Sequence, residues 1–222
     1  SSVAHEINNP LQGILTYIKL MLKKASGDEV KGSNLTDFKK YLNLMGNEIE
    51  RLGGMVKNLL VFSRQSKLEI RKSDVNSIIR NSLVLLSNKI RIQNIELDLK
   101  LQDGIPNIYC DFKQIQQTLM ALLINALEAM PKGGKIFIET KSAHGKKVEI
   151  VLKDSGDGIP SKNLKYIFEP FFSTKEAEKG TGLGLFVAYG IIQEHKGTIK
   201  VESEVGKGTT FFIMLPVEEI NE

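Results

Sequence analysis

Near the start of the chain, His5 and Glu6 stand side by side in a helical pattern, and both side chains could do chemistry. In zinc peptidases a helical histidine and glutamate belong to a His-Glu-x-x-His motif, whose second histidine completes the metal site. Here the fifth position is Asn9, so that second zinc ligand is missing. What remains is a histidine and an asparagine one helical turn apart, on the same helix face.

A second candidate is the stretch DSGDGIP, residues 154–160, which follows a predicted strand. A carboxylate at a strand end can accept a hydrogen bond from the exocyclic amine of adenine, whereas guanine presents an oxygen there and is repelled. Gly156 and Gly158 leave bare backbone that a flat ligand can approach. Taken alone, the same residues also fit a plain Asp/Gly turn, and both interpretations stay open.

The stretch GTGLGL, residues 180–185, opens a predicted helix. Its glycines free backbone N–H groups at the positive end of that helix, an arrangement suited to phosphate. The spacing differs from the dinucleotide-binding fingerprint, which also needs a preceding strand. The polar residues 173–181 before it could close over phosphates as a lid, with Lys175 either reaching a phosphate or staying solvated.

Asn125 lies inside an otherwise apolar helical pattern. It is either a structural polar group whose hydrogen bonds are satisfied within the fold, or an oxygen ligand for Mg²⁺, which takes its other ligands from water and phosphates. The aromatic cluster Phe168, Phe171 and Phe172 is predicted to belong to the core.

Composition and charge limit the classes of protein that the chain can represent. The 222 residues are 41% hydrophobic and 25% charged, with one cysteine and a net charge of +4. These values indicate a soluble globular protein of a reducing, cytoplasmic compartment. There is no basic run typical of nucleic-acid binding, and no apolar run near the ~18 residues of a membrane helix. Because the first motif begins so early, we expect a fragment whose membrane contact, if any, lies upstream.

Two helical patterns must position the histidine. Residues 35–59 repeat apolar side chains in an unbroken 3-4 spacing, and residues 7–25 carry a similar stripe. The polar stretch 26–34 predicts the turn of a hairpin. His5 and Asn9 fall on a second, polar stripe that points out of the bundle. The pattern predicts a homodimer with a four-helix bundle, and packing of the hairpin on its own chain is the alternative.

The second half mixes strand and helix patterns. Residues 67–75 are predicted as a linker, with Asp74 capping the following helix. The expected fold class is multidomain α and α+β, with a helical hairpin over 1–66 and an α/β sandwich over 67–222. Strands are predicted over 95–101, 135–141, 146–154 and 197–216, the last range holding two, and helices over 74–90, 111–130 and 183–195.

Taken in order, these motifs resemble those of the sensor histidine kinases of two-component systems. AHEINNPL matches the histidine box of that family, ALLINALEAM its asparagine box, and DSGDGIP its first glycine box. FEPFFSTK matches the phenylalanine box and GTGLGL the second glycine box. Order and spacing agree over nearly the whole chain, and the histidine box is most similar to that of nitrogen-regulation-like kinases.

The resemblance implies a dimerisation and histidine-phosphotransfer domain, followed by a catalytic ATP-binding domain with the fold of gyrase and Hsp90. It implies that His5 is the phosphoacceptor, that Glu6 holds the other ring N–H, and that Asn9 orients water to dephosphorylate a bound response regulator. The cofactors implied are ATP and Mg²⁺, with Asn125 on the metal. The implied nucleotide-binding residues are Asn125, Glu128, Asp154, Gly156, Gly158, Ile159, Lys175, Gly180, Thr181, Gly182, Leu183, Gly184, Leu185 and Thr209.

The implied function is an ATP-dependent protein histidine kinase that autophosphorylates His5. It would pass the phosphoryl group to an aspartate in the receiver domain of a response regulator. One position departs from the family, because Ala121 stands where a second asparagine is usual and where gyrase-like ATPases carry a catalytic glutamate. We therefore expect weaker or differently organised Mg²⁺ binding. The alternatives are a catalytically impaired dimeric nucleotide-binding scaffold and a gyrase- or Hsp90-like ATPase.

Overall fold

The computed structural model describes residues 3–25, 32–63, 68–143, 146–174 and 182–218. The chain forms two compact units, one of residues 1–64 with 170–183, the other of residues 65–169 with 184–222. The predicted domain boundary, between residues 66 and 67, falls outside the described residues and stays a prediction. None of the helices in the described ranges is long and apolar enough to cross a membrane.

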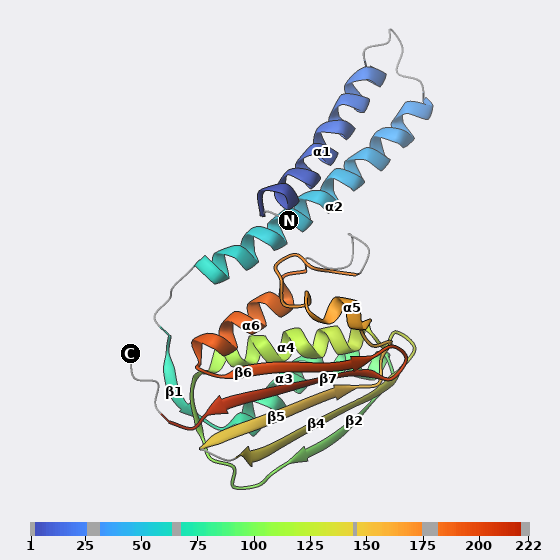
Figure 1. Cartoon of the computed structure of the whole chain (residues 1–222). Coiled ribbons are helices and arrows are strands. Elements are labelled where there is room, and N and C mark those ends of the chain that lie inside the picture. Colours follow the sequence, from blue (N-terminus) through green and yellow to red (C-terminus); the bar gives the residue numbers. More distant parts are fainter. Residues whose placement is uncertain (1–2, 26–31, 64–67, 144–145, 175–181, 219–222) are drawn as a thin grey trace. The chain divides into compact units, whose positions relative to one another are not determined.

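The first unit contains a helical hairpin, as predicted, formed by α1 (Val3–Ala25) and α2 (Gly32–Ser63) (Figure 1). Tyr17 of α1 stacks on Tyr41 of α2, with ring centroids 5.8 Å apart. Lys24 forms an ion pair with Asp37 near the end where the two helices connect. These contacts hold the second half of α1 against α2.

The apolar stripes of the hairpin are only partly covered. In α2, Phe38, Met45 and Leu52 are half-buried, whereas the intervening heptad positions are exposed. In α1 the half-buried Ile7, Ile14 and Met21 likewise alternate with exposed side chains. Half of each seam is thus half-buried within the hairpin, and half stays exposed among the residues that the structure describes. The exposed positions are Leu11, Ile18, Leu35, Leu42 and Ile49.

The second unit is built on a five-stranded sheet in the order β2-β4-β5-β7-β6. β2 and β4 run parallel, and the remaining neighbours are antiparallel. The predicted hairpin of β4 and β5 and the two predicted closing strands are confirmed. The strands are β2 (Ile95–Leu101), β4 (Gly134–Ala143), β5 (Lys147–Asp154), β6 (Thr198–Glu204) and β7 (Gly208–Pro216).

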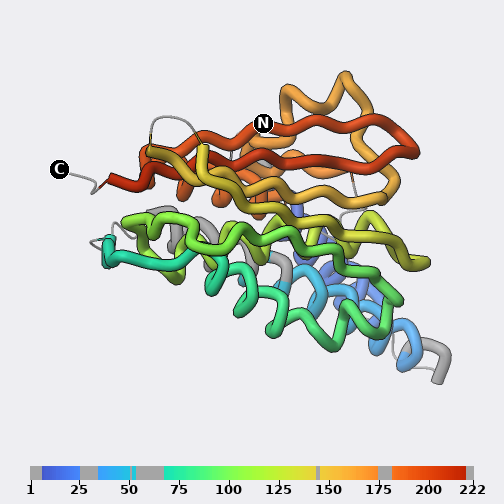
Figure 2. Tube along the Cα trace, turned by 90° about the horizontal axis from the view of Figure 1, so that it is seen from below, coloured from blue at the N-terminus to red at the C-terminus, as the bar shows by residue number. Residues whose placement is uncertain are grey.

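Helices α3 (Val75–Ile92), α4 (Phe112–Glu128) and α6 (Gly184–Glu194) cover one face of the sheet (Figures 1 and 2). The strands alternate, and the residues that face the helices are buried. Each such side chain contributes about 1.5–3 kcal/mol of hydrophobic stabilisation. The predicted α+β sandwich is thus confirmed, with its core between sheet and helices. Core residues from the sheet include Ile136, Ile138, Ile150, Leu152, Phe211 and Ile213.

The prediction of residues 67–75 as a linker is wrong in part. β1 (Ile70–Ser73) pairs antiparallel with β3 (Ile108–Asp111), which the sequence did not indicate. A strand of four residues has too little alternation to be recognised, and its partner lies far along the chain. Asp74 caps α3 as predicted, accepting a hydrogen bond from Asn76 N at 2.9 Å. A four-residue helix, α5 (Ser161–Leu164), was also not predicted.

Candidate functional site

Asp154 ends β5 and is 97% buried, with 3% of its surface exposed. Its Oδ1 accepts hydrogen bonds from the backbone N of Gly156, at 2.9 Å, and of Thr209, at 3.2 Å. Its Oδ2 makes no hydrogen bond with any described residue. Burial raises the pKa of Asp154 above its ordinary value, and the two N–H donors oppose that rise. One carboxylate oxygen is thus held in place while the other can accept a hydrogen bond from a ligand.

The structure brings Thr209 next to Asp154, and contact of Thr209 with a nucleotide stays a prediction. Thr209 lies at the start of β7 and is buried. The chain can approach Asp154 so closely because position 208 is a glycine with φ +94°, where a Cβ would lie 2.0 Å from the Asp154 carbonyl oxygen. Any larger residue would push β7 away from the end of β5.

The predicted glycines 156 and 158 are required by packing within the fold. A Cβ on Gly156 would lie 2.6 Å from the Cβ of Ala129, just after α4. Gly158 has φ +71°, and a Cβ there would lie 2.1 Å from the backbone oxygen of Glu204. Close backbone approach therefore explains both glycines without a ligand. Contact of Gly156, Gly158 and the neighbouring Ile159 with a nucleotide stays a prediction.

Asn125, which lies inside an apolar helical pattern, is half-buried in the structure. Leu122 and Leu123, earlier on the same helix α4, are fully buried. The side-chain amide of Asn125 makes no hydrogen bond with any described residue, which does not fit a satisfied structural role. Glu128, also implied in nucleotide binding, is exposed one turn later on the same helix.

The site fits a magnesium ion held largely by a nucleotide. Among the described residues no three His, Cys, Asp or Glu side chains converge on one point that could hold a metal. Mg²⁺ is commonly bound through one or two protein oxygens plus substrate phosphates, so the unpartnered amide of Asn125 is a sufficient protein ligand. Ala121 precedes Asn125 by one turn and offers no oxygen.

Of the second glycine box, Lys175, Gly180 and Thr181 lie outside the described residues. Gly182 has φ +65°, and a Cβ there would lie 2.4 Å from the backbone carbon of Phe171. Leu183 is buried.

Gly184 begins α6, whose first turn has backbone N–H groups without intrahelical partners. A Cβ at Gly184 would meet only Ala121, at 3.9 Å, so internal packing does not explain this glycine. Leu185, next to it, is half-buried.

On α1, the structure describes the helical backbone of His5 and Glu6 but not their side chains. Asn9 is exposed, and so are Thr16 and Lys19 along the same face. Their exposure agrees with the predicted polar stripe, whereas the direction of the His5 side chain stays a prediction.

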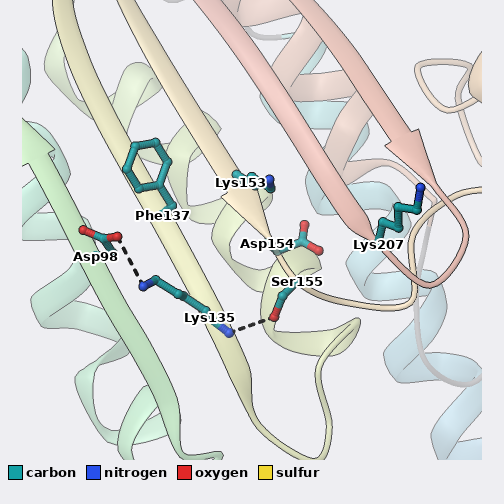
Figure 3. Close-up of a pocket in the computed structure, with 7 residues that line it drawn as sticks. All are labelled: Asp98, Lys135, Phe137, Lys153, Asp154, Ser155 and Lys207. Atoms are coloured by element: carbon teal, nitrogen blue, oxygen red, sulfur yellow. Dashed lines mark hydrogen bonds and ion pairs between the residues drawn. The ribbon is translucent and has the colours of Figure 1, made fainter.

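A pocket at the end of the sheet is lined in part by Asp154 itself, together with Lys135 and Ser155 (Figure 3). Phe137 of β4 and Lys153 of β5 pair across the sheet, on the face away from the helices. Lys135 forms ion pairs with Glu96, at 3.1 Å, and Asp98, at 3.3 Å. Because this pocket contains neither Asn125 nor Thr209, we do not assign it to the nucleotide.

Two known sequence families match the chain. Residues 1–67 match the His Kinase A (phospho-acceptor) domain. Residues 110–219 match the Histidine kinase-, DNA gyrase B-, and HSP90-like ATPase family.

Individual relatives agree with these families. Sporulation kinase E of Bacillus subtilis is 39% identical over 219 residues, which are 99% of this chain and 28% of that protein. The crystal structure of histidine kinase ThkA in complex with response regulator TrrA is 34% identical, with TM-score 0.73, over 97% of this chain and 60% of that chain. The catalytic domain of ThkA alone is 35% identical, with TM-score 0.61, over 67% of this chain and 95% of that domain.

The chain spans less than half of the length of the curated relatives it matches, 28% and 48% for the two sporulation kinases E and C. The two family matches follow each other in the same order as the five sequence motifs. The similarity to the ThkA catalytic domain agrees with that order. The chain belongs to the sensor histidine kinases of two-component systems.

Proposed function

We propose that this chain is an ATP-dependent protein histidine kinase that phosphorylates its own His5 and then an aspartate of a response regulator. Residues 1–66 act as the dimerisation and phosphotransfer domain, and residues 67–222 bind ATP in the cytoplasm. The observation that carries the proposal is the buried Asp154, held by two backbone N–H groups with one oxygen open to a ligand. That arrangement recognises the amino group of adenine.

Phosphoryl transfer asks mainly for positioning and charge neutralisation. A neutral imidazole attacks the γ-phosphorus with a ring nitrogen. The bond from that phosphorus to the bridging oxygen breaks and ADP leaves. Glu6 accepts the hydrogen bond of the other ring N–H and stabilises the positive charge that develops on the ring. Asn125 would hold Mg²⁺, which when bound neutralises phosphate charge.

The partners we propose are a second copy of this chain and a receiver domain. The uncovered half-seam of the hairpin supports the homodimer. ThkA, which is similar along nearly the whole chain, was solved in complex with a response regulator. Asn9, exposed on the polar stripe, would orient water for removal of the phosphoryl group from the regulator.

Incubation with γ-labelled ATP and Mg²⁺ tests the proposal. We expect label that is stable in base, labile in acid and absent from His5→Ala, with nucleotide affinity nearly unchanged in that variant. Because Ala121 removes one polar group from α4, a scaffold that binds ATP without transfer is the second candidate. Binding without label would favour the scaffold, and steady phosphate release without label would favour an ATPase.

A further inference from the structure

Ser203 of β6 forms a hydrogen-bonded junction beside the Asp154 site. It pairs with Thr209 of β7 across the antiparallel ladder, and the two hydroxyl oxygens are 3.0 Å apart. Its Oγ also lies 2.8 Å from the backbone N of Ile159 and 2.8 Å from the backbone O of Gly208. One hydroxyl thus joins the first glycine box to the start of β7.

The hydrogen-bond partners of Ser203 determine in which direction the hydroxyls of Ser203 and Thr209 donate. A hydroxyl has one hydrogen to donate and two lone pairs that accept. The carbonyl of Gly208 can only accept, so Ser203 donates to it, and the N–H of Ile159 can only donate, so Ser203 accepts from it. Ser203 then has no hydrogen left for Thr209. The Thr209 hydroxyl must therefore donate to Ser203.

With its hydrogen committed, the Thr209 hydroxyl has only lone pairs to offer a ligand. Asp154 Oδ2, when ionised, offers only lone pairs as well. A purine with an amino group at C6 donates hydrogen bonds to such acceptors. A purine with an oxygen at C6 meets acceptor with acceptor and leaves buried groups unpaired, which discriminates strongly against it.

We propose that Ser203 is a positioning residue that determines base specificity, because its hydroxyl fixes Thr209 as a hydrogen-bond acceptor and so favours 6-amino over 6-oxo purine nucleotides. This inference rests on the proposed nucleotide binding and deepens it. In Ser203→Ala the Thr209 hydroxyl is free to rotate and can donate to the 6-oxo group of inosine. The preference for ATP over inosine triphosphate then falls about tenfold, the effect of roughly one hydrogen bond.

The test measures dissociation constants of ATP and inosine triphosphate by calorimetry on the whole chain. The variants are Ser203→Ala, Thr209→Val and the double variant, since valine removes the hydroxyl but keeps the N–H that holds Asp154. If Ser203 acts through the Thr209 hydroxyl, Ser203→Ala has no further effect on the preference in the Thr209→Val background. Ser142→Ala, exposed near the far end of β4, is the matched control and keeps the wild-type ratio.

Each outcome separates this inference from the proposed function. Wild-type protein that binds no ATP contradicts the proposed function and this inference with it. Wild-type protein that binds both nucleotides equally overturns only the inference. Ser203→Ala could also lower the preference for ATP equally in the wild-type and the Thr209→Val backgrounds. Ser203 would then act through Ile159, and this result also overturns the inference. Should Ser203→Ala fail to fold, Thr209→Val alone must still lower the preference, and an unchanged ratio refutes the assignment.

Discussion

The uncovered half-seam of the hairpin gives a quantitative prediction for self-association. Its five side chains, Leu11, Ile18, Leu35, Leu42 and Ile49, are 40–58% exposed. Burying the exposed half of one such side chain contributes about 1 kcal/mol. Two copies that bury all five therefore gain on the order of 10 kcal/mol, before the cost of association. Because that gain exceeds the lower end of the association cost, about 4 kcal/mol, we expect the chain to self-associate.

Replacing Leu42 by aspartate tests this estimate. In a twofold dimer the change occurs twice, so about 2 kcal/mol of apolar burial is lost and two carboxylates enter the seam. We expect the dissociation constant to rise at least about 100-fold. The matched control is Leu85→Asp on α3, because Leu85 is 63% exposed but belongs to the other unit. Sedimentation equilibrium measures the dissociation constants of both variants. A wild-type chain that stays monomeric, or equal dissociation of the Leu42→Asp and Leu85→Asp variants, would refute the reasoning.

Three further predictions concern the second unit. Burial lowers the pKa of His195, whose Nε2 accepts a hydrogen bond from the backbone N of Asp111 at 3.0 Å. Below a pH of about 6.5 the unfolded chain therefore binds a proton at His195 more readily than the folded chain does. The free energy of unfolding should fall as the pH falls through this range. Urea titrations at pH 7 and 5 should show this loss, and His195→Gln should show less of it; an unchanged pH dependence would contradict the assignment. The Gly158→Ala variant should be at least about 2 kcal/mol less stable than the Gly206→Ala variant. Both glycines have a positive φ, but only Gly158 lacks space for a Cβ. Equal melting temperatures of the two variants would contradict this prediction. Burial raises the pKa of Cys110 to about 11, so iodoacetamide at pH 8 should label it only after unfolding, and mass spectrometry that finds rapid labelling of native protein would disprove this.

Much of the fold follows from local patterns. The 3-4 apolar spacing located α2, and Asp74 was correctly predicted to cap α3, where it accepts a backbone hydrogen bond. The short ladder of β1 with β3 was missed, because Ile70 pairs with Asp111 and neither four-residue strand carries a pattern of its own. Pairing at such separation depends on the tertiary structure.

The candidate site, like the fold, could be predicted from the sequence only in part. Asp154 and Thr209 were identified from the sequence and lie together in the structure. Ser203 was not, because its role depends on its cross-strand register with Thr209. The sequence also revealed Gly158, but not the Glu204 carbonyl that packs against it.

The central claim is that a nucleotide bound at Asp154 supplies the phosphoryl group of His5. The most direct measurement is to locate that group by tandem mass spectrometry at neutral pH, after incubation with ATP and Mg²⁺. The chain has three histidines, His5, His144 and His195. The account predicts phosphohistidine at residue 5 alone, and none in Asp154→Asn. Phosphate on another residue, or phosphorylation of His5 that survives Asp154→Asn, would contradict it.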